Sequence, residues 1–316
     1  MEYTDIADGK MRISKVGIGT WQGAGEDWGS DVETGKIKDA IIRANELGVN
    51  LIDTAEVYGE GQSEKIVGRA LEELDRDDVI VATKVNAHLR YDDVKKACEN
   101  SLERLNIEKI DVYQIHWPDP WQQIPMKETM RAMEDLYLEG KIENIGVSNF
   151  AVRDLREARE SLEETDVIWN QVRYNMLERQ IEREVLPYCR REDIAVIAYS
   201  PLAQGALTGK YGPENLPVDN IRTDRPTFRN NIFKKSNLKE ISDLLSVMED
   251  ISNNHDKTVA QIAINWVARK SGVIPIVGAK RPEQAEWNAN AVGWEISEDE
   301  AEEIDRELNR LELDFF

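Results

Sequence analysis

The chain has 316 residues, which is long enough for one large domain with a sizeable buried core. Its formal net charge is −21, from 40 basic and 61 acidic residues. This argues against nucleic acid or an anionic membrane surface as a partner, because both are polyanions. No apolar run approaches the roughly 20 residues that cross a bilayer, and the polar segment 1–10 does not resemble a signal peptide. The two cysteines, Cys98 and Cys189, indicate a reducing, cytoplasmic setting.

Short β-branched runs alternate with segments of helical periodicity along the chain. The runs predicted as strands are Lys15–Thr20, Asn50–Asp53, Val79–Lys84, Ile110–His116, Ile142–Ser148, Val167–Gln171, Ala195–Ser200 and Val273–Gly278. The segments predicted as helices are Val32–Leu47, Ser63–Leu74, Asp92–Leu105, Lys127–Glu139, Val152–Leu162, Ile181–Arg190, Thr258–Lys270, Glu283–Ala289 and Glu298–Leu311. Capping boxes are expected at residues 258–261 and 297–300. This alternation favours parallel strands joined by right-handed crossovers.

Eight such units predict one domain, residues 1–316, with the α/β fold of a closed (β/α)8 (TIM) barrel. Glu2–Ile13 is expected to form a short hairpin at the bottom of the barrel, and Pro201–Ser236 a long loop after the seventh strand. The competing fold is a doubly wound open sheet, which would hold a dinucleotide on a G-x-G-x-x-G turn after its first strand. Residues 16–21 offer only G-x-G, which disfavours that alternative.

The catalytic face of such a barrel lies at the carboxyl ends of its strands, and most of the predicted strands end on a polar residue. The residues at these ends are Asp53, Lys84, His116, Ser148, Asn149, Gln171, Tyr199, Ser200 and Gly278. Tyr58 follows Asp53 in a glycine-punctuated loop, from which it can fold back over the same rim. We therefore expect Asp53, Tyr58, Lys84 and His116 to form one active site.

These four residue types suit proton donation to a carbonyl group. A ketone that accepts hydride develops negative charge on its oxygen, and a tyrosine, whose unperturbed pKa is about 10, can donate the proton. Lys84 is expected to lower the pKa of Tyr58 by stabilising the tyrosinate, with Asp53 as its counter-charge. A neutral His116 can orient the carbonyl oxygen. Each residue alone also has a structural interpretation, such as a turn cap for Asp53 or a core histidine for His116.

Three sequence blocks resemble the aldo-keto reductase family, in the branch that includes potassium-channel β-subunits and general-stress proteins. The blocks are residues 48–59 (GVNLIDTAEVYG), 110–118 (IDVYQIHWP) and 140–150 (GKIENIGVSNF). The resemblance spans nearly the whole chain and implies an NADPH-dependent carbonyl reductase whose catalytic residues fall on the four positions above. The family binds its dinucleotide extended and without a Rossmann turn, which would account for the absent glycine-rich fingerprint.

The resemblance also implies where NADP(H) binds. Thr20 and Trp21 match residues near the nicotinamide ribose, and Tyr199 matches the residue that stacks on the nicotinamide ring. The residues matching carboxamide ligands are Ser148, Asn149 and Gln171. The residues along the pyrophosphate path are Ser200, Leu202, Gly205 and Leu207, and Lys210 is expected to contact the cofactor as well.

Residues 278–288 (GAKRPEQAEWN) are expected at the adenosine end of the cofactor. Lys280 and Arg281 adjoin the start of a helix, where anions bind readily. We interpret them as a 2′-phosphate site that favours NADPH over NADH, the alternative being two solvated surface cations. Related sequences often carry a glutamate where this chain has Trp287, so adenine stacking is expected there. The other expected contacts are Gly278, Gln284 and Asn288.

The loop 201–236 is basic within an acidic chain, which favours a lid over the cofactor phosphates; the alternative is a mobile surface loop. Its cations are Lys210, Arg222, Arg225, Arg229, Lys234 and Lys235, against the anions Glu214, Asp219 and Asp224. Aromatic side chains suit flat or sugar-like substrates. Those expected at the substrate mouth are Trp21, Trp28, Trp117 and Trp121. His88 and His255 lack metal-ligand spacing, so no metal is expected.

Three functions fit a barrel of this kind. The first is an NADP(H)-dependent oxidoreductase for an aldehyde, ketone or sugar-like small molecule. The second is a cofactor-sensing binding subunit of a larger complex, and the third is a phosphate-binding sugar isomerase. The presence of all four catalytic residue types favours the oxidoreductase, and the isomerase would not explain them. The sequence leaves open the substrate and whether the chain is a monomer or a homo-oligomer.

Overall fold

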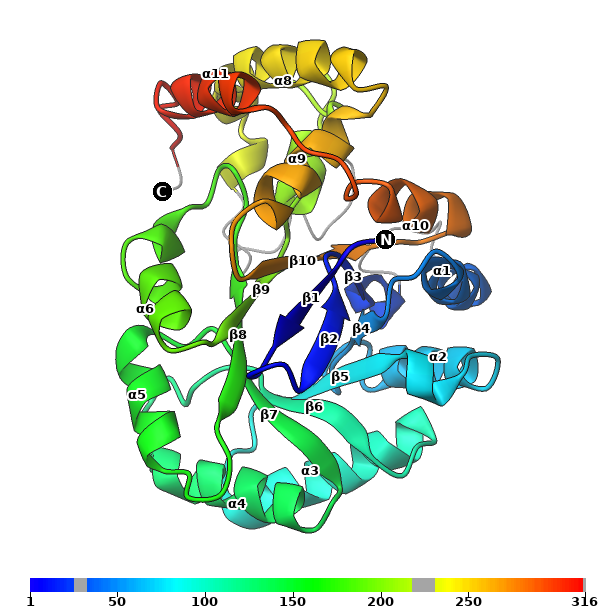
Figure 1. The fold of residues 1–316 in the computed structure, drawn as a ribbon, viewed down its shortest axis with the longest axis vertical. Coiled ribbons are helices and arrows are strands. Elements are labelled where there is room, and N and C mark those ends of the chain that lie inside the picture. The colour runs from blue at the N-terminus through cyan, green and yellow to red at the C-terminus, as the bar shows by residue number, and fades with distance from the viewer. Residues whose placement is uncertain (26–32, 218–230, 315–316) are drawn as a thin grey trace.

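Eight parallel strands form a closed barrel in the computed structural model, which describes residues 1–25, 33–217 and 231–314 (Figure 1). Around the barrel the strands follow the order β10-β3-β4-β5-β6-β7-β8-β9. Their bounds are β3 Gly17–Gly19, β4 Leu51–Asp53, β5 Ile80–Val85, β6 Ile110–Ile115, β7 Ile142–Ser148, β8 Val167–Arg173, β9 Ala195–Tyr199 and β10 Val273–Gly278. The predicted barrel is confirmed, and an open sheet is excluded because β10 pairs with both β3 and β9.

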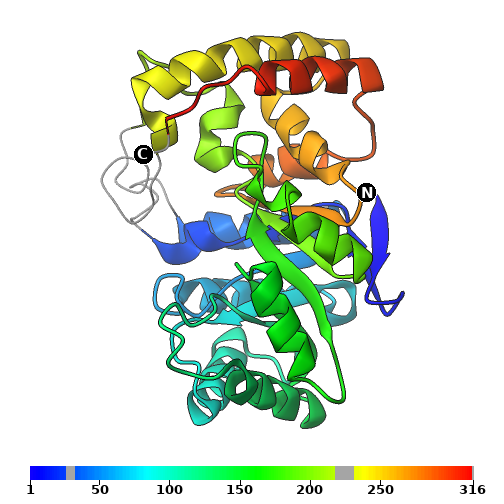
Figure 2. The same ribbon diagram turned by 90° about the vertical axis from the view of Figure 1, so that its left-hand side faces the viewer.

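Helices pack around the outside of the barrel (Figures 1 and 2). The α-helices are α1 Thr34–Glu46, α2 Gln62–Leu71, α3 Tyr91–Leu105, α4 Met126–Leu138, α5 Val152–Glu160, α6 Val185–Arg191, α8 Lys235–Asn254, α9 Val259–Ala268, α10 Pro282–Ala289 and α11 Glu298–Leu308. The short 3-10 helices are η1 Trp21–Ala24, η3 Arg76–Asp78, η4 Gln180–Glu182, η5 Ala203–Thr208 and η6 Asn231–Phe233. Both predicted capping boxes form, at Thr258 and Ser297. In the described part of the chain, no helix is long and apolar enough to cross a membrane.

The 20-residue helix α8 packs against α11 (Figure 2) and was not predicted from the sequence. The prediction placed Pro201–Ser236 in a loop and no element directly after it, whereas α8 begins at Lys235 and η5 and η6 lie within that loop. The apolar residues of α8 nevertheless recur at the intervals of an amphipathic helix. Those buried are Leu238, Ile241, Leu244, Met248 and Ile251. The signal for this helix was therefore present in the sequence.

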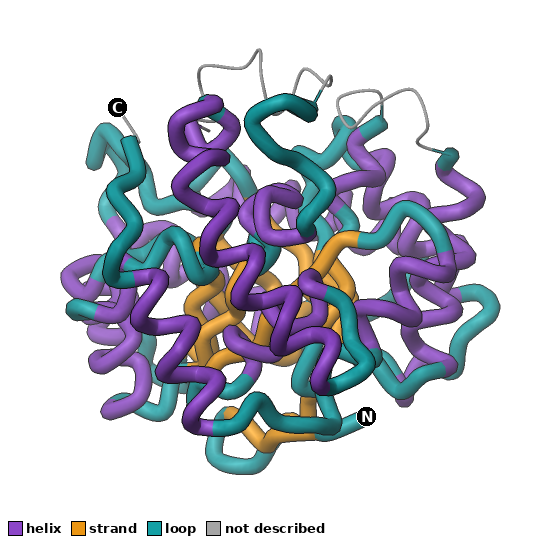
Figure 3. The backbone as a smooth tube through the Cα atoms, turned by 90° about the horizontal axis from the view of Figure 1, so that it is seen from above, coloured by secondary structure: helices purple, strands orange, loops and turns teal. Residues whose placement is uncertain are grey.

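A β-hairpin closes the bottom of the barrel, as predicted (Figure 3). Its strands, β1 Tyr3–Ile6 and β2 Met11–Ser14, pair antiparallel. Asn50, directly before β4, accepts the backbone N–H of Ser14 at 2.8 Å and so ties the hairpin to the barrel. Ile13 is fully buried in the apolar cluster that fills the lower barrel interior. This end of the interior is therefore sealed from solvent by apolar packing.

Inward-facing side chains change from apolar to polar towards the carboxyl ends of the strands. Inward positions lie two residues apart, since side chains alternate between the two faces of a strand. The successive pairs are Leu51 and Asp53, Ala82 and Lys84, Val112 and Gln114, Trp169 and Gln171, and Ile197 and Tyr199. The second residue of each pair lies at the same level of the barrel interior, directly above the apolar cluster. The fold thus gathers them at the end of the barrel where catalytic residues lie.

Gly68 in α2 tests how closely the helix layer packs. A Cβ at Gly68 would lie 2.7 Å from the carbonyl oxygen of Leu105, a backbone atom that cannot move aside easily. We expect Gly68→Ala to lower the free energy of unfolding by about 1–3 kcal/mol, a usual cost of overpacking, as measured by urea denaturation. Gly35→Ala in α1 is the control, because a Cβ there meets nothing within 4 Å and stability should hold or rise. Equal stabilities of Gly68→Ala and the parent would contradict this packing.

Candidate active site

A buried ion pair lies at the carboxyl ends of β4 and β5. Lys84 Nζ donates to Asp53 Oδ1 at 2.6 Å and to the Thr54 carbonyl oxygen at 2.7 Å. Lys84 is fully buried and Asp53 is 2% exposed. Thr20, predicted beside the nicotinamide ribose, is buried as well, and its Oγ1 donates to the Asp53 carbonyl oxygen at 2.9 Å. The structure therefore brings Asp53 and Lys84 together, and the Thr20 hydroxyl holds the end of β4 through the Asp53 carbonyl oxygen.

Tyr58 and His116 lie beside this ion pair. Lys84 Nζ is 5.1 Å from the centre of the Tyr58 ring, and the His116 ring meets the Tyr58 ring edge-on with 5.8 Å between centres. A turn closed by the Tyr58 N–H and the Ala55 carbonyl oxygen folds the loop after β4 back over the rim. The ring of Trp21, in η1, lies 6.3 Å from that of Tyr58. The four residues predicted as catalytic thus gather in one place.

The electrostatics of Tyr58 correct the expectation that Lys84 lowers its pKa. Burial, and then the negative charge of Asp53, raise the pKa of Tyr58 well above its usual value. Lys84 Nζ, 5.1 Å from the centre of the Tyr58 ring, is paired with Asp53 at 2.6 Å, so the negative charge of Asp53 acts on the phenol alongside the positive charge of Lys84. Burial also lowers the pKa of Lys84, against the pull of Asp53. Tyr58 is therefore a protonated phenol at neutral pH, able to donate a proton.

His116 is an uncharged imidazole in this site. Burial, followed by the charge of Lys84, lowers the pKa of His116 to about 3. Its carbonyl oxygen accepts from Asn149 Nδ2 at 3.1 Å. Its Nδ1 atom is buried and has no hydrogen-bond partner among the described residues. A neutral imidazole has one donor and one acceptor nitrogen. Because Nδ1 has no partner among the described residues, no hydrogen bond to Nδ1 determines which of the two nitrogens carries the proton.

Asn149 and Tyr199 belong to a hydrogen-bonded chain across the ends of β7, β8 and β9. Tyr199 Oη donates to Asn149 Oδ1 at 2.9 Å, and Asn149 Nδ2 donates to Ser148 Oγ at 3.0 Å. Ser148 Oγ donates in turn to the carbonyl oxygen of Gln171 at 2.9 Å. The guanidinium of Arg173, which the sequence analysis did not single out, lies 5.6 Å from the centre of the Tyr199 ring. The residues predicted to hold the nicotinamide are thus linked to one another.

Gln114 and Trp169, two buried side chains that the sequence analysis did not single out, complete the polar level of the barrel together with the predicted Gln171. Gln114 Nε2 donates to Asp53 Oδ2 at 3.1 Å, and Gln171 Nε2 donates to the same oxygen at 2.7 Å. Gln114 Oε1 accepts from Trp169 Nε1 at 2.9 Å. A glutamine two residues before His116 in an apolar strand was a signal that could have identified Gln114, because that spacing places both side chains on one face.

The chain after β9 makes a turn with left-handed backbone at Ser200 (φ 55°), Ala203 (φ 47°), Gln204 (φ 56°) and Gly205 (φ 105°). Non-glycine residues in this conformation are strained, and such strain gathers at binding sites. Among the predicted pyrophosphate residues, Leu202 directly precedes η5, Leu207 is buried and Lys210 is exposed. Successive backbone N–H groups in turns of this kind can form anion-binding concavities. Within this turn, the N–H groups of Ala203 and Gly205 donate to the carbonyl oxygens of Ser200 and Leu202, so contacts to an anion would come from other N–H groups of the turn.

The residues predicted for the adenosine end lie on β10 and α10. The Lys280 N–H donates to Gln284 Oε1 at 2.7 Å, and Asn288 Nδ2 donates to the Gly278 carbonyl oxygen at 3.2 Å. Arg281 is the N-cap residue of α10 and its guanidinium is half-exposed. The positive end of the helix and two cations thus lie together, an arrangement that attracts anions, although the Glu283 carboxylate lies 3.6 Å from the Arg281 guanidinium.

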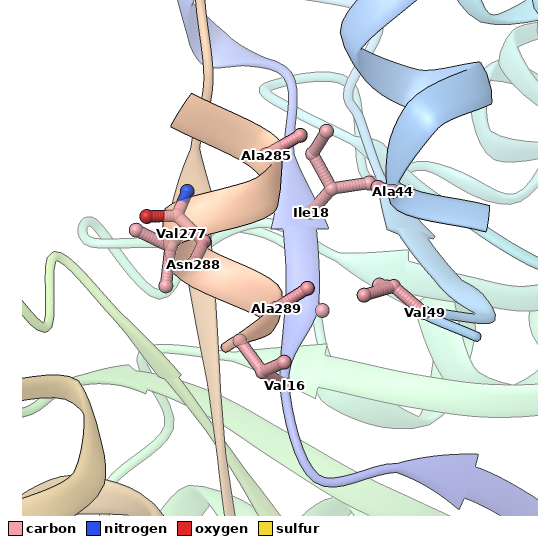
Figure 4. A pocket seen from close by; sticks show the side chains of 9 residues that line it. Val16, Ile18, Ala44, Val49, Val277, Ala285, Asn288 and Ala289 are labelled. Carbon is pink, nitrogen blue, oxygen red and sulfur yellow. The ribbon is translucent and has the colours of Figure 1, made fainter. Parts of the chain in front are cut away.

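Asn288 also borders a small hollow between β3, α1 and α10 (Figure 4). Its other lining residues are apolar or glycine: Val16, Gly17, Ile18, Ala44, Val49, Val277, Ala285 and Ala289. The cavity volume is about 10 Å³, which is room for roughly one water molecule. We interpret the hollow as a gap in packing rather than a binding site.

The tryptophans predicted for the substrate mouth occupy different surroundings. Trp21 packs beside the Tyr58 ring. Trp117 is 51% exposed and Trp121 is 79% exposed. Trp28 lies outside the described residues. The structure therefore places Trp21 at the site and leaves Trp117 and Trp121 largely open to solvent.

The loop 201–236 is described only in part. Lys234 pairs with Asp314 at 2.8 Å, and Lys235 lies 3.8 Å from Glu214. The other charged residues on which the lid prediction depends, Asp219, Arg222, Asp224, Arg225 and Arg229, lie outside the described residues. The lid stays a prediction.

Comparisons with known proteins place this barrel in a class of oxidoreductases. A sequence profile of the Aldo/keto reductase family matches residues 15–309. The aldo-keto reductase YhdN of Bacillus subtilis is 37% identical, over 96% of this chain and 92% of its own. The NADH-specific methylglyoxal reductase of Escherichia coli is 33% identical, over 95% and 96% of the two chains.

Solved structures agree with this assignment. The glycerol dehydrogenase AKR11B4 from Gluconobacter oxydans superposes with a TM-score of 0.86 at 34% identity, covering 98% of this chain and 95% of its own. An aldo/keto reductase from Klebsiella pneumoniae in complex with NADP and acetate gives 0.74 at 31% identity, covering 95% and 93%. The chain belongs to the aldo/keto reductase family.

His116 offers a direct test of the electrostatics of the site. The chain has three histidines, so their ring signals can be separated by NMR, and His116→Gln identifies the signal of His116 by its loss. We expect that signal to stay constant from about pH 8 down to about pH 5, because burial lowers the pKa of His116 to about 3. A free histidine peptide in the same tubes is the control. A midpoint near the usual 6.5 would contradict the neutral ring.

Proposed function

We propose that this protein transfers hydride reversibly between NADP(H) and the carbonyl or alcohol group of an aldehyde, ketone or sugar-like substrate. The observation that carries the proposal is the buried Asp53–Lys84 pair beside Tyr58 and His116 on the barrel rim. Relatives include reductases of methylglyoxal and pyridoxal and a glycerol dehydrogenase, which supports a small carbonyl compound or alcohol as substrate.

Tyr58 is the proton donor in this proposal. NADPH, when bound, supplies the hydride that reaches the carbonyl carbon. As negative charge grows on the carbonyl oxygen, Tyr58 Oη donates its proton to that oxygen, and the Lys84 charge opposes the cost of the tyrosinate left behind. In the oxidising direction the proton returns from the alcohol to Tyr58. The raised pKa of Tyr58 keeps the phenol protonated before reduction begins.

His116 orients the carbonyl oxygen without competing as an acid. Its lowered pKa keeps the imidazole neutral, so it can offer one N–H as a hydrogen-bond donor at neutral pH. Trp21 beside Tyr58 removes water from one side of the site, which strengthens hydrogen bonds to the developing charge. His116 and Trp21 therefore position and desolvate the group to which Tyr58 donates.

The residues along the rim fit an extended NADP(H). The Tyr199 ring is held through its hydroxyl by Asn149 and can stack on a nicotinamide ring. The left-handed turn at residues 200–205 suits a pyrophosphate, and Lys280 with Arg281 at the start of α10 suits a 2′-phosphate. We extend the proposal to a preference for NADPH on the basis of these two cations, while the Escherichia coli relative is NADH-specific.

Tyr58→Phe tests the proton donor. We expect unchanged affinity for NADP+ and a loss of about 10²- to 10⁴-fold in kcat, the usual contribution of general acid catalysis, in NADPH oxidation over a panel of aldehydes and ketones. Tyr3→Phe is the matched control, because it removes a phenol hydroxyl from the hairpin at the other end of the barrel. A Tyr58→Phe enzyme as fast as the parent would show the assignment to be wrong. A parent that binds NADP+ but reduces no carbonyl would favour the cofactor-sensing alternative.

Lys280→Ala tests the cofactor preference. Losing a charge-assisted hydrogen bond to the 2′-phosphate should weaken NADPH binding by about 10- to 100-fold, with little effect on NADH, as measured by titration of the two dinucleotides. Lys10→Ala, on the hairpin at the bottom of the barrel, makes the same change in net charge away from the rim. Equal losses for NADPH and NADH in Lys280→Ala would remove the 2′-phosphate assignment.

A further inference from the structure

The Gln114 side chain lies in the barrel between a group that only donates hydrogen bonds and a group that only accepts them. Its Oε1 accepts from Trp169 Nε1 at 2.9 Å, and its Nε2 donates to Asp53 Oδ2 at 3.1 Å. An indole N–H cannot accept and a carboxylate cannot donate, so the Gln114 amide has one satisfied orientation. All three side chains are buried, which makes an unpaired group costly.

Gly146 provides the space for this contact. In the strand register, Gly146 on β7 pairs with Gln114 on β6 and with Trp169 on β8. A Cβ at Gly146 would lie 2.5 Å from Trp169 Nε1 and 2.9 Å from Gln114 Cγ. The missing side chain therefore lets residues of β6 and β8 meet across β7, and the contact is part of the architecture of the barrel.

Asp53 and Gln114 together determine the orientation of Gln171. Gln171 Nε2 donates to Asp53 Oδ2 at 2.7 Å and lies 3.3 Å from Gln114 Oε1, its second acceptor. Both N–H bonds of the Gln171 amide are thus used inside the barrel. Its Oε1 makes no hydrogen bond within the described ranges of the chain, so this oxygen is the atom left for a donor from a ligand.

We propose that Gln114 is a positioning residue for the cofactor, which holds the Gln171 amide with its oxygen presented to the carboxamide NH2 group of a bound nicotinamide. This inference rests on the proposed NADP(H) function. The carboxamide has an NH2 group that can donate to Gln171 Oε1, so the orientation of Gln171 selects which end of the carboxamide is bound there. Without Gln114, the Gln171 amide loses one of its two inward acceptors and can rotate, and the selection weakens.

The test compares the dissociation constants of NADP+ and of its 3-acetylpyridine analogue, in which a methyl group replaces the carboxamide NH2. For the parent we expect calorimetric titration to show about tenfold tighter binding of NADP+, the effect of one hydrogen bond to a buried acceptor. In Gln114→Leu and in Trp169→Phe this ratio should fall to about two. Tyr113→Phe is the matched control on β6, because the Tyr113 hydroxyl is buried with no hydrogen-bond partner among the described residues.

The two variants make the outcomes separable. Trp169→Phe keeps the Gln114 amide and removes only its indole partner, so it carries the test if circular dichroism shows that Gln114→Leu does not fold. The positioning role of Gln114 would be overturned if the parent bound NADP+ and the 3-acetylpyridine analogue equally well. It would also be overturned if a folded variant kept the parent's ratio of the two dissociation constants. Neither result would contradict carbonyl reduction. A parent that binds neither dinucleotide would overturn the proposed function, and this inference with it.

Discussion

The buried contact between Lys84 and Asp53 is the interaction on which the rest of the site depends. Removing two charges from water costs several kcal/mol for each ion, and mutual attraction offsets this only when the remaining hydrogen-bonding capacity is also used. Here the Thr54 carbonyl oxygen accepts a second hydrogen bond from Lys84 Nζ, and Gln114 and Gln171 donate to the second oxygen of Asp53. The polar level inside the barrel is therefore what a buried ion pair requires in order to persist.

The same ion pair determines the protonation states around it. At Tyr58, burial and then the negative charge of Asp53 raise the pKa of the phenol. Burial lowers the pKa of His116, and the Lys84 charge acts in the same direction. The site thus contains a protonated phenol and a neutral imidazole side by side at neutral pH, which suits donation to an oxygen that gains negative charge.

The ion pair and the proposed nicotinamide residues form one connected network. From Asp53, hydrogen bonds lead through Gln171 to Ser148, and from there through Asn149 to Tyr199. The sealed apolar cluster and hairpin below keep this network on one level and exclude water from beneath. Because residues in such a network are coupled, effects on cofactor binding and on proton donation at this rim are not expected to add independently.

The sequence by itself determined the barrel and indicated where its candidate site lies, because both rest on local patterns. β-branched runs alternating with helical periodicity predict the architecture, and polar residues at the ends of apolar runs identify Asp53, Lys84 and His116. The pattern for α8 was also present, although it was not recognised. What only the tertiary structure decided was the environment of those residues. The direction of the Tyr58 pKa, the space that Gly146 leaves for Gln114 and the orientation of Gln171 all depend on distances between strands far apart in sequence, and on desolvation that arises only when the barrel closes.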